Sequence, residues 1–243
     1  MASGGSRACN GAWRVWRWRA VTGAAHALVV LILAGHAGAQ PPAYSGAEIR
    51  GRVVDAETKE PLAGVHVVAQ WILTSGMVHP QAITRLQILE TVTDAKGEYH
   101  LPAWGPKPRP FLTELDSSDP RLTFFRPGYR MLDRSNHVPH HEPLRTSRWH
   151  GQTIELEPFR GNAEEWVTQL QFVQMRLTWG HSTDHVVPQV NDNWKLMPRV
   201  VLAVAEQRQL LPARVRHRVR DLQDWKATEA ELRALVPQKG PSP

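Results

Sequence analysis

The chain has 243 residues and a formal net charge of +6, from 29 Lys and Arg against 23 Asp and Glu. Four of the arginines lie in the first 39 residues, which hold no acidic residue, so the rest has 25 basic and 23 acidic residues. The high isoelectric point is therefore largely a property of this leader and does not indicate a nucleic-acid partner. The single cysteine, Cys9, also lies in the leader, which excludes a disulfide or a thiol nucleophile elsewhere.

The first 39 residues have the layout of a secretory signal peptide. A cationic segment at 14–19 precedes an apolar run centred on 28–33, and Ala37 and Ala39 supply small residues before a cleavage site at Gln40. We expect an exported protein, periplasmic or extracellular; the alternative is an uncleaved anchor. No later apolar run is long enough to span a bilayer, so we expect no transmembrane segment after cleavage.

Residues 40–47 read as a flexible linker, and residues 48–158 as a domain of short strands. Apolar and polar residues alternate there, with turn residues between the runs. One predicted strand places Val65, Val67, Ala69 and Trp71 on one face, with His66 and Gln70 on the other. Further strands are predicted at 49–53, 88–93, 99–101, 122–125 and 153–156. Gly97 closes a turn that requires a positive φ. The pattern favours a mainly β fold, an antiparallel β-sandwich.

Two long loops, 105–120 and 134–150, interrupt the strands, and the period changes to helical after Pro158. Asn162 is a predicted N-cap, and apolar residues from Trp166 to Leu177 follow at helical spacing. A second helix is expected to start at Pro198 and a last short one to cover 228–235. We therefore expect a helical extension over 159–237 that covers a face or edge of the sandwich, and a disordered tail at 238–243.

The segments 49–55, 61–65 and 97–102, with the Gly-Tyr pair that ends at Tyr129, resemble the carboxypeptidase regulatory-like domain. The resemblance covers about residues 48 to 158. It implies a seven-stranded-type, transthyretin-like Greek-key sandwich, and a non-catalytic accessory module of exported bacterial proteins. Asp55, Gly64 and Tyr99 are then scaffold residues.

Histidines suggest a metal site. His137, His140 and His141 lie in one loop, with His150 beyond it, and imidazoles are ligands that zinc, copper or iron accept. A second candidate is the pair His181 and His185, which Asp184 would orient. The alternative is a solvated polar loop that binds no metal.

Signatures of common enzymes are absent from the sequence: metallopeptidase histidine–glutamate motifs, serine-hydrolase motifs and phosphate loops. Intradiol ring-cleaving dioxygenases contain a related sandwich and bind ferric iron through two tyrosines and two histidines. Tyr44, Tyr99 and Tyr129 are the only tyrosines, and Tyr99 reads as core, so two tyrosine ligands are hard to find. We therefore predict a protein that is not an enzyme and carries no cofactor.

Aromatic and basic residues suggest a binding surface. Trp104 and Trp149 beside arginines suit sugar rings or peptides, and residues 121–148 are locally basic. The first hypothesis is an exported binding or structural module of the cell envelope, with polysaccharide, peptidoglycan or another envelope protein as partner. The second is a metal-binding protein or metalloenzyme that uses the histidine loop 137–150. The third is a subunit that docks on a larger envelope complex through its helical extension.

Overall fold

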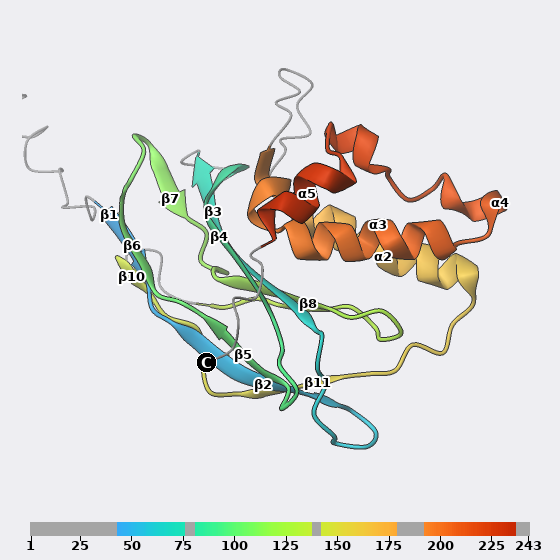
Figure 1. Cartoon of the computed structure of the whole chain (residues 1–243). Helices are drawn as coiled ribbons and strands as arrows, with labels where there is room; N and C mark the ends of the chain where they lie inside the picture. The colour runs from blue at the N-terminus through green and yellow to red at the C-terminus, as the bar shows by residue number, and fades with distance from the viewer. Residues whose placement is uncertain (1–42, 76–80, 138–141, 179–191, 237–243) are drawn as a thin grey trace, which may run out of the picture. The chain divides into compact units, whose positions relative to one another are not determined.

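The computed structural model describes residues 43–75, 81–137, 142–178 and 192–236, which belong to one compact unit of the chain (Figure 1). The predicted leader lies outside these residues. The strands are β1 (Ala43–Gly46), β2 (Ile49–Asp55), β3 (His66–Ser75), β4 (Gln81–Val92), β5 (Glu98–Leu101), β6 (Trp104–Pro108), β7 (Thr113–Leu115), β8 (Arg121–Phe125), β9 (Leu132–Arg134), β10 (Leu144–Arg145) and β11 (Thr153–Leu156). The helical elements are α2 (Ala163–Thr178), η1 (Asp192–Leu196), α3 (Pro198–Leu210), α4 (Ala213–Arg216), η2 (Leu222–Trp225) and α5 (Glu229–Leu235).

The largest sheet has the order β4-β3-β8-β9, with β7 also pairing with β3. Its central strand β3 is antiparallel to both neighbours, and Val68 lies opposite Glu90 on one side and Thr123 on the other. Residues along β3 are buried on both faces, because a layer packs on each side of the sheet. We call it the central sheet.

Two three-stranded sheets have the orders β10-β1-β6 and β11-β2-β5. In the second, β11 runs parallel to β2, with Ile154 opposite Val53, and β5 is antiparallel to β2. The tight turn that leads from β4 into β5 contains Gly97, whose φ of 72° confirms the predicted positive-φ position. Asp55 closes the loop after β2 by accepting hydrogen bonds from the backbone N–H groups of Glu57 and Thr58.

The buried side chains form two apolar cores, one on each face of the central sheet. The sandwich core, between the sheets, includes Trp71 and Phe124. The helical core, between the central sheet and the helices, includes Phe125 from the sheet, Val173 from α2 and Val201 from α3. Adjacent residues of β8 thus point into different cores, as the alternation of a strand requires.

The helical layer is built largely as the sequence predicts. Asn162 caps α2, since its side-chain oxygen accepts from the backbone N–H groups of Glu164 and Glu165. Pro198 occupies the first turn of α3, and Thr228 forms a capping box at the start of α5. Among the described helices, none is both long and apolar enough to cross a membrane.

A mainly β fold with several sheets and C-terminal helices is thus confirmed. Three segments that were expected to be linker or loop contain strands, however. Residues 43–46, expected within a flexible linker, form β1, and Tyr44 is buried. The proline-rich stretch 105–120 contains most of β6 and all of β7, and residues 134–150 contain β10. These short strands pair with β1 and β3, which lie far away in the sequence, so local alternation gives little sign of them.

Candidate functional site

A cavity of about 360 Å³ opens where the start of β3 meets α3 and α5. This volume lies in the range of small-molecule sites. The lining combines apolar side chains with a concentration of ionisable ones: His66, Arg199, Leu202, Ala203, Glu206, Arg233 and Val236. We call it the His66 cavity.

The imidazole of His66 lies at the sheet side of the cavity. His66 is the first residue of β3, and its ring is 6.3 Å from that of Phe125 on the neighbouring strand. Its Nδ1 is buried and has no hydrogen-bond partner among the residues that the structure describes. Burial, and to a smaller extent the charge of Arg199, lowers the pKa of His66 to about 4. At neutral pH the ring is therefore uncharged and presents one nitrogen as acceptor and one as donor.

Glu90 joins the sheet to the start of α3. No side chain of the local sequence caps this helix, and the carboxylate of Glu90 takes that place from β4. One oxygen accepts from the backbone N–H of Val200 at 2.6 Å and the other from that of Arg199 at 3.1 Å. Burial raises the pKa of Glu90 to about 7, although these bonds and the charge of Arg199 act against the rise. At neutral pH its negative charge is only partly present.

The cations of the cavity differ in their partners. Arg233 lies 3.5 Å from Glu206 and donates to Glu229 at 2.8 Å, so two carboxylates offset its charge. Arg199 has its electrostatic neighbours in neutral His66 and half-protonated Glu90. The charge of Arg199 is therefore the least compensated in the cavity.

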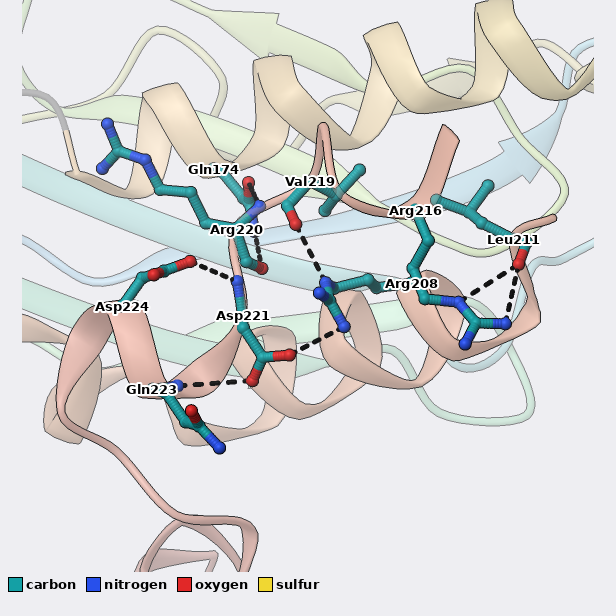
Figure 2. Close-up of polar contacts among 9 residues, drawn as sticks. All are labelled: Gln174, Arg208, Leu211, Arg216, Val219, Arg220, Asp221, Gln223 and Asp224. Carbon is teal, nitrogen blue, oxygen red and sulfur yellow. Dashed lines mark hydrogen bonds and ion pairs between the residues drawn. The ribbon is translucent and has the colours of Figure 1, made fainter. Parts of the chain in front are cut away.

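A hydrogen-bond network holds the helices that carry these side chains (Figure 2). Arg208 of α3 donates to the carbonyl of Val219 at 2.9 Å and forms an ion pair with Asp221 at 2.7 Å. Gln174 of α2 donates to the carbonyl of Arg220 and accepts from its backbone N–H. These contacts tie α2, α3 and the chain leading to α5 together.

The last turn of α3 is held in the same network. Arg216 donates from two nitrogens to the carbonyl of Leu211 just after the helix, as Figure 2 shows. Asp221 accepts from the backbone N–H of Gln223 and starts η2. Because α3 carries Arg199, this anchoring holds one wall of the cavity in place.

Chemically, the cavity suits recognition of an anion. A guanidinium and a neutral imidazole supply donors, and Leu202 and Ala203 of α3 supply an apolar wall. With a pKa near 4, His66 is a weak base at neutral pH, so the geometry favours binding over proton abstraction.

The predicted metal ligands are placed only in part. His140 and His141 lie outside the described residues, as do His181, Asp184 and His185.

The two described members of the predicted set are exposed. His137 follows the end of the β9 segment, while Nδ1 of His150 lies 2.9 Å from the carbonyl oxygen of Glu48. Within the described ranges, no three His, Cys, Asp or Glu side chains are grouped to hold a metal. The metal site therefore stays a prediction.

The two predicted binding tryptophans are half-buried and in contact with the sandwich core. Trp104 packs edge to face on buried Trp71, with 5.1 Å between ring centroids. Trp149 donates from Nε1 to the carbonyl of Ser135, and the guanidinium groups of Arg134 and Arg148 lie over its ring. Their role in binding a ligand stays a prediction.

The arginines of residues 121–148 have internal contacts. Arg145 is 1% exposed and donates to the carbonyl of Leu115, and Arg126 lies 4.9 Å from the ring centroid of Tyr129. Arg130 forms an ion pair with Glu157 at 3.6 Å. Three arginines of this basic stretch therefore have partners within the protein, and Arg145 is part of its interior.

Sequence reasoning missed the members of the His66 cavity. His66 was placed correctly on the face opposite Trp71, but a lone histidine gave no sign of a site. Arg199 and Arg233 lie in helices far along the chain. The one available signal was a helix at Pro198 without an N-cap residue, which calls for a capping partner elsewhere.

Comparisons with known proteins give distant likenesses. No family model matches the chain, and no curated protein does. A 3-chlorocatechol 1,2-dioxygenase from Rhodococcus opacus 1CP is 16% identical with a TM-score of 0.28, over 48% of this chain and 61% of that one. This chain thus spans less than two thirds of that dioxygenase.

Two further structures give similar scores. The C-terminal domain of the shaft pilin SpaA from Lactobacillus rhamnosus GG is 14% identical over 47% of this chain and 98% of that one, with a TM-score of 0.24. The dioxygenase domain of a dioxygenase and carbohydrate-binding protein fusion from Streptomyces sp. SirexAA-E is 16% identical over 49% and 82%, with a TM-score of 0.25.

These neighbours correct two predictions. Two of the three are dioxygenases, which contradicts the prediction that the chain is not an enzyme. The prediction that it carries no cofactor is contradicted by the same neighbours. Both predictions are withdrawn. TM-scores below 0.5 carry no argument for a dioxygenase activity of this chain.

Proposed function

We propose that this chain is an exported binding protein of the cell envelope that takes a small anionic molecule into the His66 cavity. The observation that carries the proposal is the guanidinium of Arg199, set at a cavity of about 360 Å³ beside the uncharged ring of His66. Carboxylate and phosphate groups are the anions that arginine binds best. Such groups occur on small metabolites and on envelope polymers alike.

Export is part of the proposal and is supported by the leader described from the sequence. The sandwich is proposed to be of the transthyretin-like Greek-key kind, in a domain over residues 48–158 with the helical extension at 159–237. The Asp55 loop and the Gly97 turn support this, since both form where the resemblance places scaffold residues. N-terminal sequencing of the exported chain tests the cleavage before Gln40.

Binding is tested on the full chain by isothermal titration calorimetry with two probes, inorganic phosphate and succinate. We expect one saturable site for at least one probe. Arg199→Gln should weaken it by about tenfold or more, the loss expected when one charge-assisted hydrogen bond is removed. The backbone N–H of Arg199 still reaches Glu90 in this variant, so the start of α3 is kept.

The matched control is Arg160→Gln, which removes an exposed arginine that pairs with Glu57. It should leave the affinity unchanged. Two results would overturn the proposal: no saturable binding of either probe, or the same loss of affinity in both variants, which would mean that general charge is responsible.

A further inference from the structure

A second polar group lies on the helix-facing side of the central sheet, two residues along β3 from Val68. Gln70 stands opposite Arg121 of β8, and Ile72 stands opposite Arg85 of β4. Since residues two apart on a strand share a face, Gln70, Arg85 and Arg121 lie on the same face. Asp119 lies next to this part of β3, since its Oδ2 accepts a hydrogen bond from the backbone N–H of Ile72.

Three of these side chains are deeply buried. Gln70 is 2% exposed, Arg85 9% and Asp119 fully buried. Arg85 donates one hydrogen bond, from Nη2 to the carbonyl of Arg176 in α2 at 3.5 Å. Its Nε and Nη1, the Nε2 of Gln70 and the Oδ1 of Asp119 have no partner in the described part of the chain. Buried polar atoms are nearly always bonded, so this concentration calls for a ligand or for water.

The charges of the group favour an acceptor. Burial lowers the pKa of Arg85 to about 10, the charge of Asp119 acts against this shift, and Arg121 adds to it. Burial raises the pKa of Asp119 well above its usual value, although the hydrogen bond from Ile72 and the charges of Arg121 and Arg145 act against the rise. The nitrogen atoms left over on Gln70 and Arg85 are donors, and they lie beside a cationic centre.

We propose that Gln70 and Arg85 form a buried site for a small planar oxyanion of the carboxylate class. Such a ligand offers acceptors to the nitrogen donors left over on both side chains and compensates the guanidinium in a place where an isolated charge is costly. The site is separate from the His66 cavity: Gln70 lies four residues further along β3, and neither member lines that cavity.

The test uses the full chain carrying Arg199→Gln, which removes the central cation of the His66 cavity. Formate replaces chloride stepwise at constant ionic strength, and the midpoint of thermal unfolding is measured at each step. We expect a saturable rise of the midpoint, as for a ligand that binds the folded state. Adding Arg85→Met should abolish the rise.

Gln70→Leu is the second variant, because it keeps the size of the side chain and leaves Arg85 in place if Arg85→Met does not fold. It should raise the dissociation constant for formate by about tenfold. A midpoint that does not respond to formate, or responds equally in Gln70→Leu, overturns the proposal and assigns these donors to water. Neither outcome affects the His66 cavity, whose test compares Arg199→Gln with the unmodified chain.

Discussion

On one face of the central sheet Trp71 and Phe124 pack in the apolar sandwich core, whereas on the other face His66, Glu90 and Arg85 lie among the helices. Both faces are buried, and the sandwich core holds one group with a strongly raised pKa, Tyr99, whereas His66, Arg85 and Glu90 are three such groups with strongly shifted pKa values on the helical side. Desolvated charges of this kind cost stability. The comparison teaches that the sandwich face is built to hold the fold, and that the helical face gives up stability where the candidate sites lie.

The largest expected effect tests whether the two faces of the central sheet pack into separate cores. Phe124→Ala and Phe125→Ala remove neighbouring, fully buried rings from opposite faces. Each should lower the free energy of unfolding by about 3–5 kcal/mol in chemical denaturation. Only Phe125→Ala should speed hydrogen exchange of α2 and α3 below the global opening, because its ring belongs to the helical core. Identical exchange patterns would show that the cores act as one.

The next effect concerns pH. The pKa of Glu90 is raised to about 7 in the folded chain, so its contribution to stability is full below pH 4.5 and is lost as the pH rises through 7. The pKa of His66 is lowered to about 4, so its contribution is present above pH 6.5 and lost as the pH falls towards 4. Each amounts to about 3 kcal/mol.

These opposed slopes nearly cancel between pH 4.5 and 6.5, and single variants should expose them. In Glu90→Gln, the free energy of unfolding should rise with pH over this range; in His66→Gln, it should fall. Urea denaturation at several pH values measures both. Parallel profiles in the two variants would refute the assigned protonation states.

The smallest effect is expected in the helical layer, at the N-terminal end of α2. Asn162→Ala removes the cap of α2 and should cost about 1 kcal/mol, with the loss of helix signal starting at that end. Replacing Asn162 by Asp, which also caps, is the control and should keep stability close to that of the unmodified chain. A cost as large for Asp as for Ala would mean that the cap itself contributes little.

A feature of this molecule can be predicted from the sequence when the residues that determine it lie close together in the chain. The faces of β3, the cap at Asn162 and the turn at Gly97 are set by neighbours within a few residues and were predicted. Strand β1 was not predicted, because its partners β6 and β10 lie far along the chain and Tyr44 is buried in the sandwich core.

The candidate sites could not be predicted from the sequence for the same reason. Glu90 lies on β4 with no local pattern around it, and its partners are backbone N–H groups more than a hundred residues later. Arg85 reads as an ordinary surface arginine until the sheet is covered by α2. The metal prediction was based on a histidine cluster in one loop, but residues that lie close together in the sequence need not lie close together in space.

The parallel pairing of β11 with β2 has a consequence for how the chain is made. Val53 finds its partner Ile154 only after about a hundred further residues have left the ribosome. Until then one edge of β2 presents open backbone groups, and closure of the loop between them is slow. Fragments that end before residue 153 lack β11 and leave this edge of β2 open, so we expect them to be prone to aggregate.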